Sequence, residues 1–412
     1  MNIKYDVAIV GGGIVGLLTS LALAKTGCKI IHIEKDQLQV KNDNRSIAVS
    51  YSSIAFLNTL GLWDRVASTT QVIKEVHISD KGRYGRAEIF AKDENLPFLG
   101  AIAPMRELLA VALQSVTESP NIIKSFETNV TNLKKEADEY SLVVEKQGQK
   151  STIRAGLIIA CDGANSSMRK MLDVDAQTTD YKQDAVVFDI QTDLDNENTA
   201  YERFMTDGVL AMLPKSKTTM GCVWTVDRQD SKVKLNLDKK EFEELVQDRF
   251  GYRLGEVKVA TKPAVFPLYL VQSNEVYKDN VLFFGNALHF LHPVSGQGMN
   301  LSIRDIGFLY DLINKQVTEQ SRSASDIFNP FEIKIILQEF EKVRKPDHDR
   351  TINITHGFVK WFVSNDRKLV ASRNVGLHLL QRSKLAKKAL SRVMMGKLTK
   401  GSTLMRKVVE DE

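Results

Sequence analysis

The sequence is poor in cysteine and lacks any apolar run long enough to be convincing as a membrane span. Its 412 residues include three cysteines, Cys28, Cys161 and Cys222, which are far apart and odd in number. Such a set fits neither a disulfide framework nor a zinc site. We therefore expect buried thiols in a reducing cytoplasm, and we expect any membrane contact to be peripheral.

The chain also lacks a strong overall charge excess, internal repeats and low-complexity tracts. A net charge of +5, with 43% hydrophobic and 26% charged residues, is ordinary for a soluble globular protein. We expect no nucleic-acid partner. The length is ample for two domains with separate cores.

The positive charge is concentrated near the C-terminus. Between Lys360 and Glu410 there are 13 Lys and Arg, and Asp366 is the only acid before Glu410. Apolar residues alternate with these charges, which is typical of basic amphipathic helices. Such helices lie on an anionic membrane surface or hold a partner protein. Helices packed on the body of the protein with a solvated basic face show the same pattern, so both interpretations stay open.

A glycine-rich turn follows a predicted strand near the N-terminus. Residues 5–10 read Tyr-Asp-Val-Ala-Ile-Val, which suits a strand buried on both faces. Gly11 permits a tight turn, Gly13 lets backbone approach a pyrophosphate, and Gly16 lets the following helix pack closely. The helix expected over 17–25 would point its N-terminal N–H groups at the phosphates.

An acidic residue completes this dinucleotide-binding pattern. A second predicted strand, residues 29–33, ends at Glu34, about 20 residues after the glycines, where a carboxylate can accept from a ribose hydroxyl. A secretory signal is the competing interpretation of the apolar stretch 7–24. Asp6 lies in the flank that should be positive, and cleavage would remove the glycines, so we reject it.

A second glycine turn lies in the middle of the chain. The predicted buried strand 157–161 runs into Asp162 and Gly163, where the glycine frees the backbone to turn beside a ligand. The Asp162 carboxylate can orient hydroxyl donors, and Arg169 could balance negative charge. Alone, this pattern is usually only a turn.

The third segment begins with the predicted strand 281–284. It continues through Gly285 and Asn286 to residues 296–300, which read Gly-Gln-Gly-Met-Asn before a predicted helix. The helix start could bind a second phosphate, or it could stabilise the negative charge that a flavin acquires at N1–C2=O on reduction. Asn286 offers both a donor and an acceptor to a ribityl chain.

Together the three segments predict an α/β protein of two interleaved domains. A Rossmann-like FAD-binding domain with a parallel sheet alternates with a mixed or antiparallel β-sheet domain for the substrate, and helices follow at the C-terminus. The predicted ranges are 1–71, 100–180 and 280–350 for the FAD-binding domain, 72–99 and 181–279 for the substrate domain, and 351–412 for the basic amphipathic helices.

With these three segments, the sequence resembles the single-component FAD-dependent aromatic hydroxylases of the para-hydroxybenzoate hydroxylase fold. Within these it is similar to the ubiquinone-biosynthesis hydroxylases, over residues 1 to about 396. The residues that carry the resemblance are Gly11, Gly13, Gly16 and Glu34; Arg45 with Ala48; Asp162 to Ala164 with Ser166 and Arg169; and Gly285, His292, Pro293, Gly296 to Gly298, Asn300, Arg304 and Asp305.

One position departs from the usual pattern of the family. Most members carry Asp where this chain has Asn286. The branch that acts on 2-polyprenyl-6-methoxyphenols is similar to this chain in having Asn there, which favours that branch without settling the substrate.

The resemblance implies a cycle run mainly by the flavin. NADPH or NADH reduces FAD, a flavin C4a-hydroperoxide forms with O2, and an OH group passes to an electron-rich ring in a dry pocket. Pro293 would lie along the flavin face, with His292 beside it as the other catalytic candidate. The candidate cofactor-binding residues are Gly11, Gly13, Gly16, Glu34, Lys35, Arg45, Arg106, Asp162, Gly163, Gly285, Asn286, Gly296, Gln297, Gly298, Met299 and Asn300.

Two histidines three residues apart invite a metal interpretation. We expect no metal, because no carboxylate or cysteine completes a set near His289 and His292, and Pro293 directly after them would interrupt a helix. A histidine here could deprotonate a phenol, or it could be a loop histidine satisfied by backbone. The sequence does not identify the group that activates the substrate hydroxyl.

The leading hypothesis is a cytoplasmic, membrane-peripheral FAD-dependent monooxygenase that hydroxylates a polyprenylated phenol in ubiquinone biosynthesis. The protein partner, if any, would be a quinone-synthesis complex bound through the C-terminal helices. Two alternatives stay open: a flavin-dependent reductase or dehydrogenase of an isoprenoid lipid, and a non-catalytic flavin-bound scaffold of such a complex.

Overall fold

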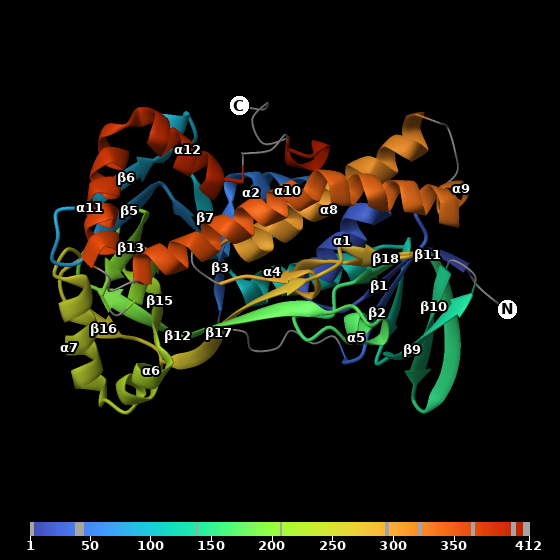
Figure 1. Ribbon diagram of the computed structural model, residues 1–412, viewed down its shortest axis with the longest axis horizontal. Coiled ribbons are helices and arrows are strands. Elements are labelled where there is room, and N and C mark those ends of the chain that lie inside the picture. The colour runs from blue at the N-terminus through green and yellow to red at the C-terminus, as the bar shows by residue number, and fades with distance from the viewer. Residues whose placement is uncertain are drawn as a thin grey trace.

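The computed structural model describes residues 4–37, 45–136, 139–206, 208–292, 296–319, 324–363, 367–396 and 401–406. Two large sheets lie along the long axis of the molecule, and the long helices α8 and α10 run beside them (Figure 1). The predicted α/β class with a parallel sheet is confirmed.

The first sheet is mainly parallel, and its centre is apolar on both faces. Its order is β18-β19-β11-β1-β2-β8, with β9 and β10 continuing from β11. Val7, Ala8 and Ile9 of β1 are fully buried, as expected for a strand covered on both sides. The strands are β1 (Lys4–Val10), β2 (Ile30–Glu34), β8 (Ile122–Phe126), β9 (Asn129–Glu136), β10 (Glu139–Lys146), β11 (Gln149–Ala160), β18 (Tyr277–Lys278) and β19 (Val281–Phe283).

Helix α1 (Ile14–Ala24) follows β1 directly and packs against α4 (Met105–Glu118) and α8 (Gln297–Glu319). It begins after Gly13 and is followed by Gly27 at φ +82°, where a residue without a Cβ is favoured. The other helices are α2 (Tyr51–Thr59), α3 (Trp63–Val66), α5 (Ser167–Met171), α6 (Arg228–Leu235), α7 (Lys239–Phe250), α9 (Ala324–Ile327), α10 (Pro330–Val363), α11 (Arg367–Arg382) and α12 (Lys384–Met394).

The second sheet is largely antiparallel, and one of its faces is covered by α7. Trp224, which is fully buried, lies there against Phe242 of the helix. The order is β20-β17-β12-β15-β14-β13-β5-β6, with β16 beside β12. The strands are β5 (Glu75–Asp80), β6 (Arg86–Phe90), β12 (Ala176–Thr192), β13 (Thr199–Met205), β14 (Gly208–Pro214), β15 (Thr219–Asp227), β16 (Val257–Val259), β17 (Ala264–Ser273) and β20 (His289–Phe290).

The opposite face of this sheet carries a separate apolar cluster. Val76, Ile78, Ala200, Phe204 and Val209 belong to it, and they come from β5, β13 and β14. The C-terminal region contributes Leu377 and Met395 to the same cluster. A small sheet of β3 (Ser46–Ser50), β7 (Gly100–Pro104) and β4 (Gln71–Ile73) lies next to it.

One long helix crosses the predicted boundary between residues 350 and 351. The boundary at 350 falls within α10, a single helix over Pro330–Val363 that contains Pro346. The short strand β20 also pairs with β17 of the second sheet, although it lies beyond residue 280. Among the described helices, none is both long and apolar enough to cross a bilayer.

Replacing Gly16 with Ala should destabilise the fold, because the added Cβ would lie 2.0 Å from the Gly11 carbonyl oxygen. A backbone atom cannot rotate away, so we expect a loss of about 1–3 kcal/mol in the free energy of unfolding, typical of overpacking. Urea titration of the flavin-free protein measures this loss. Gly13→Ala is the matched control, since a Cβ there meets nothing within 4 Å. Equal stability of the two variants would contradict the close packing.

Candidate active site

Three parallel strands end side by side at one edge of the first sheet. Val10 of β1 pairs with Ala160 of β11, and Ala160 pairs with Phe283 of β19. The chain leaves these strands at Gly11, Cys161 and Phe284, so the three glycine segments meet at the carboxyl edge of the sheet. Ligands of parallel α/β sheets bind outside this edge.

The first glycine turn has the close contacts that its sequence predicts. Gly11 adopts φ +118°, and a Cβ there would lie 2.4 Å from the Cys161 carbonyl oxygen. Gly13 precedes α1, where an added Cβ would meet nothing within 4 Å, and no side chain caps the helix. The start of α1 is therefore open to an anionic group.

Glu34 lies beside this turn. Its carboxylate accepts hydrogen bonds from the backbone N–H groups of Gly12 and Asp36, the latter at 3.0 Å. The acid therefore stands at the end of β2 next to the glycines, where the sequence places it. Lys35 follows Glu34 with an exposed side chain and does not line the central cavity.

In the second segment, the two carboxylate oxygens of Asp162 differ in their contacts. Asp162 Oδ2 accepts from Ser167 Oγ and from the Met168 N–H, each at 3.0 Å. Asp162 Oδ1 is buried and has no partner in the described part of the chain. Gly163 follows at φ +90°, and its missing Cβ leaves open space. The buried Arg169 donates to the Ala164 carbonyl, which holds the turn.

In the third segment, the Asn300 side chain bonds to the residue that precedes α8 and to β3. Its amide nitrogen donates to the carbonyls of Gly296, at 2.7 Å, and Ala48, at 2.9 Å. Its amide oxygen accepts from the Ser50 N–H at 2.9 Å. These bonds use the side chain on backbone groups, so Asn300 holds Gly296 next to β3 rather than reaching into the cavity. Gln297 is likewise buried at the helix start.

One cavity of about 560 Å³ connects the strand edge with the second sheet. Its lining includes eight of the predicted site residues, namely Gly13, Arg45, Gly163, Asn286, His292, Gly296, Gly298 and Met299. Cys161 also lines it, and burial raises the pKa of its thiol. The segment near residue 290 therefore shares a cavity with the first glycine turn.

The two predicted arginines differ in position. Arg45 lines the cavity from the residue before β3. Arg106 lies in the first turn of α4 with an exposed side chain, whereas its helix neighbours Met105 and Leu109 line the cavity. The structure thus brings Arg45 to the site and leaves Arg106 outside its lining.

His292 is a buried member of the lining and lies edge-on to the Tyr181 ring, with 5.2 Å between ring centroids. Burial lowers the pKa of His292 to about 4, so the imidazole is neutral at neutral pH. Pro293, the other catalytic candidate, lies outside the described residues.

The expectation that no carboxylate accompanies His289 is wrong. His289 Nε2 lies 3.3 Å from Asp305 Oδ2, and His348 Nε2 lies 2.7 Å from Asp305 Oδ1. These three side chains are buried and could group around a metal ion. Arg344 Nε, however, donates to the same Asp305 oxygen at 2.7 Å. The cluster is therefore an ion-pair network, and His292 is not part of it.

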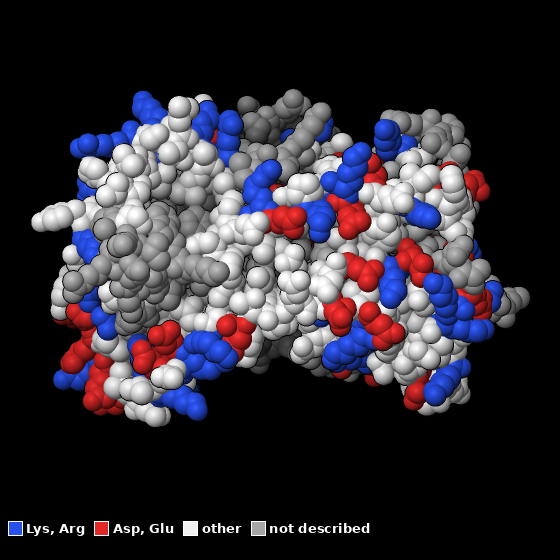
Figure 2. All heavy atoms as spheres, in the orientation of Figure 1, with Lys and Arg blue, Asp and Glu red and all other residues white. Residues whose placement is uncertain are grey.

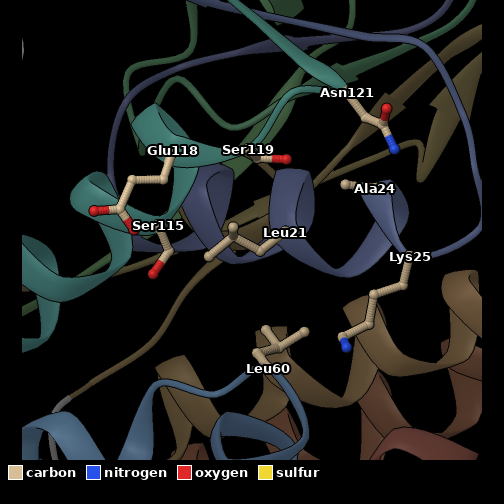
Figure 3. Close-up of a pocket in the computed structure, with 8 residues that line it drawn as sticks. All are labelled: Leu21, Ala24, Lys25, Leu60, Ser115, Glu118, Ser119 and Asn121. Atoms are coloured by element: carbon tan, nitrogen blue, oxygen red, sulfur yellow. The ribbon is translucent and has the colours of Figure 1, made fainter.

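Another hollow lies at the far end of α1 from the glycine turn (Figure 3). It is formed by Leu21, Ala24 and Lys25 of α1, by Leu60, and by residues 115–121 around the end of α4. None of the predicted site residues lines it. The central cavity is therefore the candidate active site.

A parallel sheet with a glycine turn at its edge, joined through one cavity to an antiparallel sheet, defines a flavoprotein of the hydroxylase class. The FAD binding domain family model matches residues 4–325, and the chain belongs to that family. A squalene epoxidase model matches residues 246–409. The predicted FAD cofactor and the predicted class of FAD-dependent hydroxylase are confirmed.

Similar proteins include a ubiquinone hydroxylase, UbiL, of Rhodospirillum rubrum, at 28% identity over 96% of this chain and 90% of that protein. The 3-demethoxyubiquinol 3-hydroxylase of Escherichia coli is 26% identical over 96% of this chain and 99% of that protein. The crystal structure of PqsL, a probable FAD-dependent monooxygenase from Pseudomonas aeruginosa, matches with a TM-score of 0.74 at 19% identity, over 91% of this chain and all of that chain, and shows the shared fold.

The residues around the cavity fit FAD. The open space at Gly13, Gly163 and Gly298 leaves room for a close ligand, and the uncapped start of α1 suits a pyrophosphate. The unpartnered Asp162 Oδ1 is a buried acceptor that a ligand hydroxyl would satisfy.

Gly13→Val should abolish FAD retention with little effect on folding. The β-branched side chain would occupy the open space at the start of α1, where the pyrophosphate must approach. The ratio of flavin absorbance to protein absorbance after purification measures retention. Gly357→Val is the matched control, since a Cβ at this exposed position of α10 also meets nothing within 4 Å. Full flavin occupancy in Gly13→Val would refute the assignment.

Proposed function

We propose that this chain hydroxylates the aromatic ring of a polyprenylated phenol in ubiquinone biosynthesis, with NAD(P)H and O2 as co-substrates. The observation that carries the proposal is the single cavity that joins the dinucleotide edge of the first sheet to an apolar wall of the second. The apolar members of this wall include Val76, Val209, Ala211, Leu213 and Val223. Relatives that act on ubiquinone precursors support the same substrate class.

For the cofactor, we assign the turn from Gly11 to Gly13 and the start of α1 to the pyrophosphate, since free N–H groups and the helix dipole favour anions. Glu34 is assigned to the adenosine ribose. Asp162 and Asn286 are assigned to the ribityl chain, which is rich in hydroxyl groups.

Bound FAD supplies the acceptance of hydride from NAD(P)H and the activation of O2. One oxygen atom enters the ring, the other leaves as water, and NAD(P)H is oxidised. The protein must bind the phenol, orient it and exclude water. Neutral His292, held against Tyr181, lines the cavity without adding a positive charge to it.

The purified protein should be yellow, and its oxidation of NADPH or NADH should accelerate with a short-chain polyprenylphenol. Matched consumption of one O2 per NAD(P)H, with a hydroxylated ring recovered by mass spectrometry, is the expected result. The flavin-free Gly13→Val variant gives the background rate.

The same measurement separates the alternatives. Reduction of an isoprenoid lipid without O2 uptake would identify a reductase, and a flavin-bound protein that oxidises no NAD(P)H would identify a scaffold. Either outcome refutes the hydroxylase proposal.

We also propose that α11 and α12 dock on an anionic membrane surface. Val375 and Leu379 of α11 and Leu385 of α12 are 59%, 61% and 83% exposed. Exposed basic residues, Arg382, Lys384, Lys388 and Arg392, flank them. Lys and Arg also gather at the upper left of Figure 2, in the region of these helices. Exposed apolar side chains with a positive rim suit anionic headgroups.

The combined variant Val375→Ser, Leu379→Ser and Leu385→Ser should lose most of its binding to vesicles that contain phosphatidylglycerol. Vesicle flotation measures binding, which should also fall with salt. Phe331→Ser with Ile335→Ser is the matched control, because these side chains of α10 are 71% and 41% exposed elsewhere on the chain. Unchanged flotation of the α11–α12 variant would refute the docking surface, as would binding only to a protein complex.

A further inference from the structure

The wall of the cavity formed by the second sheet carries one carboxylate. Among the described lining residues, Arg45 and Glu202 are the charged ones, and they stand on different walls. Arg45 precedes β3, whereas Glu202 lies in the middle of β13. The wall around Glu202 is mainly apolar, and the Thr225 hydroxyl that also lines it bonds to the backbone of Val209, so the carboxylate is the charged feature that a substrate would meet there.

The strand register explains why Glu202 faces the cavity. Glu202 pairs with Ala211 of β14 and with Ile78 of β5. Side chains two residues apart lie on the same face of a strand, so Glu202 shares its face with Ala200 and Phe204. Both of these belong to the apolar cluster on that face. The carboxylate therefore emerges from an apolar surface.

Nothing in the described part of the chain forms a hydrogen bond or ion pair with Glu202. The side chain is half-buried, and because it lines the cavity, its remaining exposure is toward that space. A carboxylate in apolar surroundings without a partner is costly, and such groups are typical of functional sites. The missing partner is best supplied by a ligand in the cavity.

We propose that Glu202 receives the hydroxyl of the phenol substrate and acts as the base that draws off its proton. This inference rests on the proposed hydroxylase function and names the activating group for it. An ionised phenol is more electron-rich at its ring carbons, which is what an electrophilic oxygen donor requires. The apolar side chains around Glu202 would hold the rest of the substrate.

The electrostatics of the wall support this role. Burial, with no contribution from a neighbouring charge, raises the pKa of Glu202 to about 7. A base whose pKa lies near the working pH is still ionised and yet strong enough to accept a phenol proton. An ordinary carboxyl, near pH 4.5, would be a much weaker base.

The other titratable groups near this wall either have a partner of their own or stay uncharged near neutral pH. Asp80, on the same face of β5, lies 3.4 Å from Arg83. From α10, which also contacts β13, His356 bonds with the Tyr181 hydroxyl at 3.1 Å. Burial raises the pKa of Tyr201, the preceding residue of β13, so it stays protonated near neutral pH.

Glu202 ends the reaction in the protonation state in which it began. The phenol O–H bond breaks as the Glu202 O–H bond forms, and the electron pair stays on the phenol oxygen. After the ring has received its oxygen atom, the ring carbon loses its hydrogen as a proton, and Glu202 returns its own proton to the phenol oxygen. Glu202 is neither oxidised nor reduced, and the electrons for O2 come from NAD(P)H.

Glu202→Gln tests the proposal, because it keeps the shape and removes the base. We expect kcat/KM for the prenylphenol to fall by roughly 100-fold or more, typical for loss of a general base. In the wild type, kcat/KM should decline as pH falls below about 7, since the carboxylate becomes protonated. The variant should lack this decline. Its FAD content after purification should equal that of the wild type, which shows that the variant is folded and loaded.

Two further variants keep the test specific. Glu202→Asp should recover part of the activity, and a fluorinated, more acidic phenol should be impaired less by Glu202→Gln than its parent. Glu75→Gln is the matched control, because burial also raises the pKa of this carboxyl of β5, which does not line the cavity. It should behave as the wild type.

The outcomes separate the two proposals. A wild type that hydroxylates prenylphenols, with a Glu202→Gln variant within threefold of it and the same pH profile, would overturn the role of Glu202 alone. A wild type that retains FAD and hydroxylates no phenol would overturn the proposed function, and the base with it.

Discussion

The parallel pairing of β19, β11 and β1 is the constraint on which the site depends. These strands come from the third, second and first flavin segments, and their register brings Phe283, Ala160 and Val10 level with one another. Each strand alone ends in an ordinary turn. Because parallel strands share a carboxyl edge, their pairing assembles three turns into one surface for an extended ligand. The glycines then keep that surface free of side chains.

The second half of the site is held by a buried ionic network. Asp305 of α8 accepts from Arg344 and His348 of α10, and it also contacts His289 of β20. Breaking such a buried network is strongly destabilising, because it leaves charges without partners. The network therefore fixes β20, and with it the start of the segment that carries His292, relative to α8. Asn300 fixes the other end of that segment against β3.

The sequence predicts the dinucleotide half of the molecule better than the substrate half. Glycine spacing after a β-branched strand is a local pattern, so Gly11, Gly13, Gly16 and Glu34 can be placed without tertiary information. The roles of Asn300 and Asp305 depend on contacts across distant segments, which no local pattern contains. Their positions in a motif indicate the site, but only the structure shows that both hold other parts of the chain.

Glu202 shows why the substrate half is harder. In the sequence it stands between Tyr201 and Arg203, and nothing local marks it as lining a cavity. The alternation of Ala200, Glu202 and Phe204 on one face is a signal that could have been used, since a lone acid on an apolar strand face is unusual. Which face points to the ligand depends on how β13 pairs with β5, a strand that lies more than a hundred residues earlier in the sequence.

The Cys161 thiol affects how readily the enzyme is inactivated by peroxide. Any enzyme that activates O2 releases some peroxide when the transfer to substrate fails, and peroxide attacks thiolates rather than thiols. Cys161 lines the cavity, yet burial keeps its thiol protonated. The Cys161 thiol is thereby less reactive toward peroxide that forms in the cavity. Peroxide released in the cavity would first meet this protonated thiol, which reacts slowly. Oxidative inactivation would therefore have to occur at other residues of the chain.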